Sequence, residues 1–382
     1  LRDLKHGMEL YPPLQTSDSP VKIAATVKEF DVESLDPEDW TYPPEYSFRR
    51  ETLRSFSPHV MYAHCSMQQS IVSANLTEED ISNKDTGLYT ASAGSSRFLH
   101  SSLEKMYKKG VMRCNPLHIV ASIAGTVSFN LVSDFKIQGS STGFASACAS
   151  SGHAIGFAYD EIRMKRQKRM FVVGAEDCNF DSIVPFCGMR ALTLSDDPDT
   201  AARPFDKNRQ GFVSSGGGVT IVLESEEEVD RRGAEPLGEM VGWGQASDGY
   251  NVAVSHPEGR GLQTAMQNCL HYSALDPQQI GYVNAHAPST PIGDLSEVLA
   301  MKEVFLPDAS PMISSTKALT GHGLSLSSIL ESAICILCLN YGFVPGSAHI
   351  QELMPEAGPL NIIRSTLNET PKFIMSNSSG FG

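Results

Sequence analysis

The sequence has little that would suit a membrane or a nucleic acid. No run of about 18 or more uncharged apolar residues is present, and the best candidate, residues 328–344, is interrupted by Glu331. We therefore expect no membrane span. The 30 Lys and Arg residues are outnumbered by 44 Asp and Glu. The resulting net charge of −14 would repel a nucleic-acid backbone, so we expect no nucleic-acid partner.

The chain also lacks a dense cysteine framework and, at its start, a basic segment followed by an apolar one. Its 8 cysteines are scattered over 382 residues, which indicates reduced thiols and a cytoplasmic protein. Cys335 and Cys338 form a CxxC pair inside an apolar run. Because no second pair of ligands lies nearby in the sequence, core packing is favoured over redox or metal chemistry. We expect neither a metal nor a cofactor of its own.

The order of periodic segments predicts two related α/β halves, residues 1–225 and 226–382. The first eighty residues are rich in proline and acidic residues and read as an irregular cap. Helices and strands then alternate, and the alternation restarts after an acidic hinge at 224–230. The expected elements are helix 116–131, a helix from Cys148 to about 167, strand 169–174, strand 237–242, helix 258–274, strand 280–286 and helix 294–305.

In each half a turn of small residues opens a helix. The first turn reads SACASSG at 146–152 and the second reads KALTGHG at 317–323. A cysteine in the first turn of a helix lies against free backbone N–H groups and the positive end of the dipole, which favours the thiolate. Cys148 is therefore a candidate nucleophile, with a small packing residue as the alternative.

Two histidines are the further candidates for chemistry. His286 ends a strand and precedes APSTP, so it should project from a strand end, where open α/β sheets hold their ligands. A structural histidine is the alternative. The second turn sets Lys317 and His322 at the entrance to another helix.

The order of these motifs resembles that of the elongating β-ketoacyl-acyl-carrier-protein synthases. The matching segments are SACAS at 146–150, residues 284–294, residues 314–322 and NSSGFG at 377–382, with RPFDK at 203–207 and GFV at 211–213 between them. The resemblance covers about 18–382 and is weakest before 86. It implies a thiolase-like α/β fold of duplicated αβαβα halves in five layers. It also implies a homodimer or a pseudo-symmetric heterodimer of ketosynthase and chain-length factor.

The same resemblance implies the roles of the site residues. Cys148 would hold the acyl chain as a thioester, and the backbone N–H groups of Cys148 and Phe381 would form an oxyanion hole. His286 and His322 would stabilise the enolate formed when malonyl thioester loses carbon dioxide. Lys317 and Glu331 would tune and orient the histidines, although Glu331 could instead solvate a helix face.

An acyl carrier protein is the implied partner, and it would bring its substrates on its own phosphopantetheine arm. Such carriers are acidic, so the enzyme needs a local basic surface. Arg190 matches the docking position of the family, and the other candidates are Lys105, Lys108, Lys109 and Arg113. The dense basic run at 163–169 ends a helix and is interpreted as a solvated helix end.

Several residues depart from the family pattern. Ala287 and Pro288 follow His286 where Gly and Thr are usual, so the grip on the pantetheine arm should rest on Thr290. Ser379 replaces a usual phenylalanine, and the sequence SLSS at 325–328 stands where very small Gly and Ala residues are usual. These changes indicate a specialised branch that makes a polyene or polyketide. We also expect family strands at both ends to be absent from this sequence.

Two alternatives remain from other classes. A non-catalytic chain-length subunit would resemble its active partner, but Cys148, His286, Lys317 and His322 are all retained. A thiolase acting on coenzyme A esters would use a second cysteine near the carboxyl end, and residues 371–382 contain none.

Overall fold

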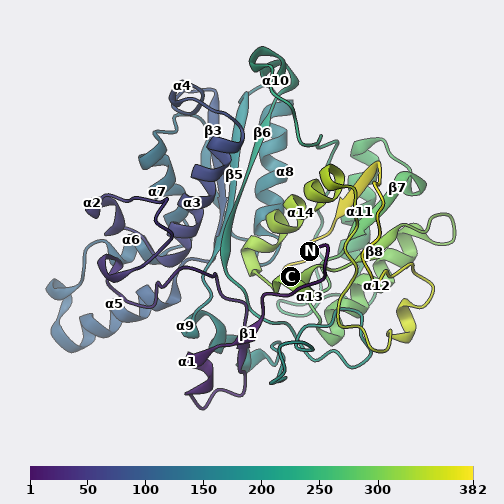
Figure 1. The fold of residues 1–382 in the computed structure, drawn as a ribbon, viewed down its shortest axis with the longest axis horizontal. Helices are drawn as coiled ribbons and strands as arrows, with labels where there is room; N and C mark the ends of the chain where they lie inside the picture. The colour runs from purple at the N-terminus through teal and green to yellow at the C-terminus, as the bar shows by residue number, and fades with distance from the viewer. Residues whose placement is uncertain (382) are drawn as a thin grey trace.

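The chain is built on two main β-sheets, and in each the central strand is parallel to both of its neighbours (Figure 1). The structure is a computed structural model that describes residues 1–381; Gly382, the last residue of the NSSGFG motif, lies outside it. The first sheet has the order β4-β3-β5-β6, the second has the order β8-β7-β9, and β1 pairs with β2 near the N-terminus. The strands are β1 (Glu9–Leu10), β2 (Ile23–Ala24), β3 (Thr86–Ala91), β4 (Ser141–Phe144), β5 (Arg169–Glu176), β6 (Gly217–Glu224), β7 (Ile280–Asn284), β8 (Met312–Ser314) and β9 (Phe373–Ser376).

The two sheets share a topology. In the first, β3 is parallel to both β4 and β5, and β6 is antiparallel to β5. In the second, β7 is parallel to both β8 and β9. Each sheet therefore has a central strand flanked by the next two strands of the chain. The carboxyl ends of β4 and β8 occupy equivalent places, and each leads into one of the two small-residue turns.

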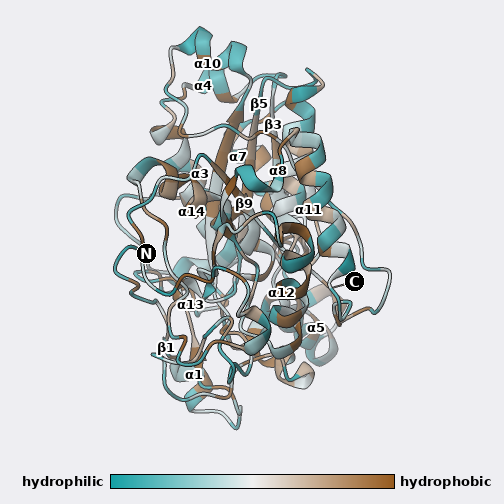
Figure 2. Ribbon diagram, turned by 90° about the vertical axis from the view of Figure 1, so that its right-hand side faces the viewer, coloured by the Kyte–Doolittle hydropathy of each residue, from teal (hydrophilic) through white to brown (hydrophobic). Residues whose placement is uncertain are grey.

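The helices complete five layers. Helices α3 and α7 cover one face of the first sheet, α8 and α14 fill the space between the sheets, and α11 and α12 cover the outer face of the second. Figure 2 shows apolar colour on β5 and polar colour on the peripheral α4 and α10. The helices are α1 (Pro12–Gln15), α2 (Arg50–Leu53), α3 (Pro58–Ser73), α4 (Glu78–Ile81), α5 (Ser96–Lys109), α6 (His118–Ser122), α7 (Thr126–Phe135), α8 (Ser150–Arg163), α9 (Phe180–Ile183), α10 (Glu226–Arg232), α11 (Arg260–Ser273), α12 (Pro291–Phe305), α13 (Lys317–Thr320) and α14 (Ser327–Tyr341).

The N-terminal eighty residues are more regular than the sequence predicted. Helix α3 begins with Pro58 at its first position, where a missing N–H is tolerated. Its first eight residues are all buried, and it packs against β5 and β6. The reading of this region as an irregular cap was wrong here, because apolar residues from Pro58 to Met67 outweigh the prolines around them.

Two other predicted elements also differ. The helix expected at 116–131 is divided into α6 and α7, with Gly125 preceding the second helix. Residues 237–242 form no strand, because within residues 1–381 no strand pairs with them. They line a cavity of about 2500 Å³ next to β6 and β9 instead.

One helical segment, Leu324–Tyr341, is long and apolar enough to cross a membrane by length and composition alone. It includes α14, which packs against α8, β6 and β9. Glu331 lies in its middle and is paired with the buried Lys317. These contacts are those of a core helix between two sheets.

Candidate active site

The nucleophile turn is held in a conformation that few residues adopt. Ala147 has a φ of 48°, in the left-handed region, and Cys148 lies two residues before the first residue of α8. The Ser150 hydroxyl accepts a hydrogen bond from the Ser146 N–H at 2.8 Å and donates one to the Ala147 carbonyl at 2.6 Å. Gly380 packs on this turn so closely that an added Cβ would lie 2.5 Å from the Ser146 carbonyl oxygen.

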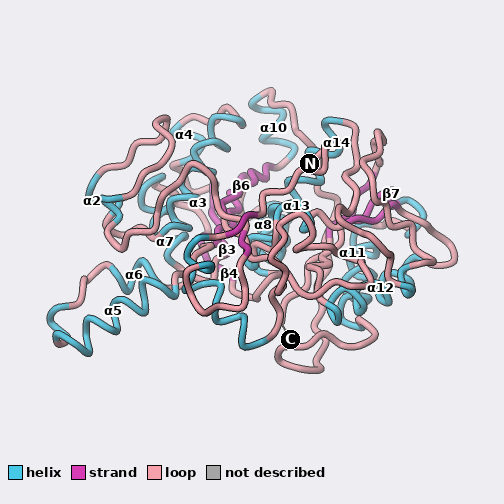
Figure 3. The backbone as a smooth tube through the Cα atoms, turned by 60° about the horizontal axis from the view of Figure 1, so that its bottom comes forward, coloured by secondary structure: helices cyan, strands magenta, loops and turns pink. Residues whose placement is uncertain are grey.

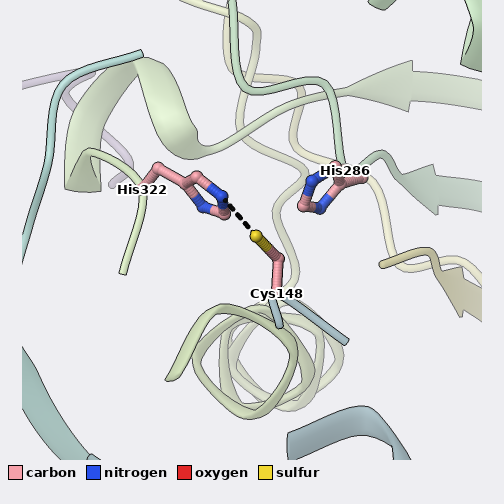
Figure 4. Close-up of side chains that lie close together, drawn as sticks. All are labelled: Cys148, His286 and His322. Carbon is pink, nitrogen blue, oxygen red and sulfur yellow. Dashed lines mark hydrogen bonds between the residues drawn. The ribbon is translucent and has the colours of Figure 1, made fainter. Parts of the chain in front are cut away.

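Cys148, His286 and His322 converge at the end of this turn (Figure 4). The Cys148 Sγ lies 3.0 Å from His322 Nε2. Each of the three offers an atom within 4.8 Å of the others, and the two imidazole rings meet edge to face with centroids 5.2 Å apart. In the chain, 138 residues separate Cys148 from His286 and 36 residues separate His286 from His322. The structure thus brings together three residues that the sequence analysis selected from distant segments.

The resting state of Cys148 differs from the sequence expectation. Burial raises the pKa of the Cys148 thiol to about 12, while the positive charge of Lys317 acts in the opposite direction. The prediction that the helix start favours a thiolate was wrong for the resting site, because Cys148 precedes the first turn and is buried. Burial therefore favours the protonated thiol, and its sulfur faces His322 Nε2, which accepts a thiol proton in the tautomer that carries the ring proton on Nδ1.

His286 is fixed by two groups of its own half. Its backbone N–H donates to Glu297 Oε1 at 2.9 Å, and the next N–H, of Ala287, donates to Glu297 Oε2 at 2.6 Å. Lys317 Nζ lies 3.4 Å from His286 Nδ1. An ammonium group only donates, so Nδ1 is the acceptor and Nε2 carries the ring proton.

Lys317 and Glu331 form a buried ion pair, and each side chain is 1% exposed. Burial raises the pKa of Glu331 to about 7, and Lys317 opposes that shift. The alternative that Glu331 solvates a helix face is wrong, since its carboxylate faces the interior. Burial, and after it the charge of Lys317, holds the pKa values of both His286 and His322 well below the usual value. Both rings are therefore neutral at physiological pH.

Sequence reasoning missed two buried carboxylates that support the loop after His286. Glu297 holds the main chain at His286, and it also accepts from Asn377 Nδ2 at 3.1 Å. Asp294 accepts from the N–H groups of Ser289 and Thr290 at 3.0 and 3.1 Å. Both carboxylates come from the first two turns of α12, and acidic residues three apart just after the APSTP loop were a usable signal for them.

The remaining predicted residues lie in three places. Pro288 is buried and Thr290 half-buried at the start of α12, while Ser379 is half-buried and Phe381 is 50% exposed beside the nucleophile turn. Within residues 1–381 the N–H groups of Cys148 and Phe381 have no hydrogen-bond acceptor. The predicted docking residues are exposed: Arg190 follows a short 3₁₀ turn, and Lys105, Lys108 and Lys109 lie on α5, the helix that projects in Figure 3.

One thiol and two imidazoles are also ligand types that zinc prefers. The ammonium of Lys317, 3.4 Å from His286 Nδ1, places a fixed positive charge against any cation bound there. The electrostatics of this site favour neutral rings and developing negative charge instead.

Two family models match the chain. One, described as beta-ketoacyl synthase, N-terminal domain, matches residues 2–229, and one described as beta-ketoacyl synthase, C-terminal domain, matches residues 237–351. The chain belongs to the β-ketoacyl synthase family. Among its curated relatives is the 3-oxoacyl-[acyl-carrier-protein] synthase 1 of Escherichia coli K12, 38% identical over 87% of this chain and 82% of that protein. The protein of the same name from Haemophilus influenzae is 34% identical over 99% of this chain and 90% of its own length.

Solved structures agree with this assignment. A β-ketoacyl synthase from Burkholderia phymatum superposes with a TM-score of 0.90 at 28% identity, covering 100% of this chain and 91% of that one. A type II polyketide ketosynthase solved with its acyl-carrier protein superposes with a TM-score of 0.88 at 21% identity, covering 100% of this chain and 90% of that one, which shows the shared fold. The predicted family, the thiolase-like five-layered fold and the ketosynthase class of acyltransferase are confirmed. The alternative of a non-catalytic chain-length subunit is not favoured.

Proposed function

We propose that this β-ketoacyl synthase extends an acyl chain held on Cys148 by decarboxylative condensation with a malonyl thioester on an acyl carrier protein. The observation that carries the proposal is the 3.0 Å contact between Cys148 Sγ and His322 Nε2, with His286 in the same cluster. A nucleophile, a base within reach and a second imidazole are what such a reaction requires.

In the first half-reaction His322 Nε2 takes the thiol proton while Cys148 Sγ attacks the acyl thioester carbonyl. The tetrahedral oxyanion lies against the N–H groups of Cys148 and Phe381, which are free to donate. The C–S bond to pantetheine then breaks, and the leaving thiolate departs with one proton. The acyl group remains on Cys148 as a thioester.

In the second half-reaction the malonyl group loses carbon dioxide and leaves an enolate. The Nε2–H of His286, fixed by Lys317 at Nδ1, donates to the enolate oxygen. The enolate carbon attacks the Cys148 acyl carbon, a C–C bond forms, and the Cys148–acyl C–S bond breaks. The Cys148 thiolate that leaves takes up one proton from solvent and regenerates the thiol. Glu331 supports this step by holding Lys317.

A carrier protein supplies both thioesters in this proposal, so the enzyme needs no cofactor of its own. Arg190 is exposed at the end of a 3₁₀ turn, where its own backbone has a φ of 54°. With Lys105, Lys108, Lys109 and Arg113 it would attract an acidic carrier. Arg190→Glu should weaken turnover of carrier-bound substrate several-fold and leave a small thioester mimic usable; equal losses with both would refute docking there.

Strand β4 supports a two-chain assembly. It forms an edge of the first sheet, and Ser141, Thr142 and Gly143 on it are exposed. Open edges are places where another chain pairs, which fits either a homodimer or a ketosynthase and chain-length-factor heterodimer.

We propose a cytoplasmic site of action for this assembly. The changes at Pro288 and Ser379 support a specialised acyl substrate such as a polyene or polyketide chain.

The experiment that tests the proposed function is intact mass spectrometry after incubation with an acyl-loaded carrier protein. We expect one added acyl mass that maps to the peptide containing Cys148. Addition of malonyl-loaded carrier should then discharge that mass and release carbon dioxide. An acyl group on any other residue, or none, would refute the assignment.

A further inference from the structure

The carbonyl group of Cys148 is the point where three segments of the chain meet. The Ser328 hydroxyl, in the first turn of α14, donates to this oxygen at 3.1 Å, and the Ser378 hydroxyl, just after β9, donates to it at 3.0 Å. A carbonyl oxygen has two lone pairs, so these two donors satisfy it. No backbone N–H within residues 1–381 bonds to it. Two side chains of the second half therefore hold the main chain at the nucleophile of the first half.

The peptide group after Cys148 is fixed at both ends. Its carbonyl accepts from the two serines, and its N–H, which belongs to Ala149, donates to the Ser146 carbonyl at 3.1 Å. The peptide group before Cys148 is fixed at its carbonyl, where Ala147 accepts from the Ser150 hydroxyl at 2.6 Å. Its N–H, that of Cys148, has no acceptor among the described residues. This N–H is thus held in place by its neighbours and remains available to a substrate oxygen.

The close approach of α14 to α8 makes the Ser328 contact possible. The Ile329 N–H, next in the chain to Ser328, donates to the buried Ser151 hydroxyl at 3.1 Å. A Cβ added at Gly152 would lie 3.2 Å from the Ser328 side chain, closer than most Cβ atoms come to another group. Ser328 itself is 4% exposed. Its hydrogen bond is therefore part of the packing between two helices.

Ser378 connects the same carbonyl to the segment that carries Phe381. Its neighbour Asn377 is anchored by two hydrogen bonds, from the N–H to the Asn284 carbonyl at 2.9 Å and from Nδ2 to Glu297 at 3.1 Å. Three residues after Ser378, the Phe381 N–H has no acceptor in the part of the chain that the structure describes. Ser378 therefore ties the position of this second free N–H to that of the nucleophile.

We propose that Ser328 and Ser378 are positioning residues that set the spacing of the two N–H groups of the oxyanion hole. This rests on the proposed function and identifies what holds its oxyanion hole in place. A tetrahedral oxyanion is stabilised best by donors that need not move when its charge develops. Such an oxyanion forms when Cys148 is acylated and again when the enolate attacks the acyl group. The enolate itself is bound by His286, so decarboxylation does not depend on this spacing.

The test compares the two half-reactions in Ser328→Ala, Ser378→Ala and the double variant. Self-acylation is followed by intact mass, and decarboxylation of malonyl-loaded carrier without an acyl donor by release of labelled carbon dioxide. We expect each single variant to slow self-acylation about two- to tenfold, the effect of one hydrogen bond. The double variant should slow it about 10²-fold, as loss of one oxyanion donor does. Decarboxylation should fall far less, so the ratio of the two rates should change.

Two further variants control for packing. Ser378→Thr keeps the hydroxyl and should recover most of the self-acylation rate. Ser332→Ala, on the same helix as Ser328, removes a hydroxyl that donates within that helix, and it should leave both rates unchanged. Equal losses in the two half-reactions would assign the serines to packing alone and overturn the proposal. So would a folded double variant that acylates at the wild-type rate.

An infrared measurement reports on the oxyanion hole directly and needs only the single variants, each of which keeps one donor to the Cys148 carbonyl. Acylation with a ¹³C-carbonyl thioester places the labelled carbonyl beside the two N–H groups, whose hydrogen bonds lower its stretching frequency. We expect the band to move to higher frequency in Ser328→Ala and in Ser378→Ala. An unchanged band in both variants would refute the proposal. Failure of the proposed function itself would appear separately, as wild-type enzyme that does not acylate Cys148.

Discussion

The same strand, turn and helix occur in both halves of the molecule, yet the two copies carry different chemistry. In the first half β4 leads through the Cys148 turn into α8, and in the second β8 leads through the turn with Lys317 and His322 into α14. The two helices pack against each other between the sheets. The duplicated framework therefore brings two helix entrances together, and the residues placed on each entrance decide its role.

The two entrances also differ in charge. The buried ion pair of Lys317 and Glu331 belongs wholly to the second half, as does Glu297 behind His286. The first half contributes the Cys148 thiol and one of the two proposed oxyanion-hole N–H groups, while the other, of Phe381, belongs to the second half. This separation predicts that proton transfer depends mainly on the second half, while the first half holds the acyl chain.

Removal of the nucleophile should have the largest effect. Cys148→Ala should abolish condensation, because no other thiol lies at the start of α8. Decarboxylation of malonyl-loaded carrier should persist, since both histidines remain. Condensation and carbon dioxide release are measured in parallel, with Cys269→Ala on α11 as the control. Chain extension by Cys148→Ala would remove the first half from the mechanism.

Removal of His286 should impair malonyl decarboxylation and spare self-acylation, the opposite of the result expected for Cys148→Ala. His286→Ala should slow malonyl decarboxylation by about 10²–10⁴-fold, the usual contribution of one acid or base group. Self-acylation should change little, because the partner of Cys148 Sγ is His322. Labelled carbon dioxide and intact mass report the two rates. A larger loss in self-acylation than in decarboxylation would contradict the assigned roles.

Breaking the ion pair of the second half should cost stability. Glu331→Gln leaves the Lys317 charge buried without its partner, and such changes cost about 3–5 kcal/mol in the free energy of unfolding. The double variant Lys317→Met/Glu331→Leu should recover most of that loss, because it buries no charge. Urea denaturation measures both, with Glu78→Gln in an exposed pair as the control. Equal destabilisation by the single and double variants would refute the charge argument.

The same double variant should shift the pH dependence of decarboxylation. In the wild type the pKa values of His286 and His322 lie well below 6.5, so both rings stay neutral and decarboxylation should continue at pH 5.5. An ordinary histidine would be about nine-tenths charged there. Without Lys317 both pKa values should rise, though burial keeps them below 6.5. The acid limb of the pH–rate profile should move upward, and an unchanged limb would exclude Lys317 as a cause.

Sequence reasoning selected Cys148, His286, Lys317 and His322 because each stands in a short motif at a predicted helix or strand end, and it selected Glu331 through the family resemblance alone. The sequence alone could not predict which residues of different motifs contact one another in the fold. The approach of Gly380 to the Ser146 carbonyl and the Glu297 contacts behind His286 join segments far apart in the chain. Periodicity within a segment carries no information on such contacts.

The errors in the fold have similar causes. Helix α3 was hidden by the prolines around it, although a proline at the first helical position is permitted. The strand expected at 237–242 has the right composition but lacks a neighbouring strand, and a strand depends on its partner. The thiol state of Cys148 depends on burial, which a turn motif does not report.

The smallest expected effect concerns Pro288, in the loop that leads from His286 to α12. Proline offers neither a side-chain hydroxyl nor an N–H. Two residues later, the Thr290 N–H is held by Asp294, whereas in residues 1–381 the Thr290 hydroxyl has no hydrogen-bond partner. That hydroxyl is therefore free to bond an incoming pantetheine arm, and Pro288 is not.

A neutral hydrogen bond contributes about 0.5–1.5 kcal/mol, or about two- to tenfold in binding. Pro288→Thr should lower the apparent KM for carrier-bound substrate by such a factor, and Thr290→Ala should raise it. Neither variant should change the rate at which Cys148 reacts with a small thioester mimic, because the arm is absent from that substrate. Steady-state kinetics with both substrates check this. If neither variant altered the KM for the carrier-bound substrate, the arm would have to approach Cys148 by a route that avoids the loop after His286.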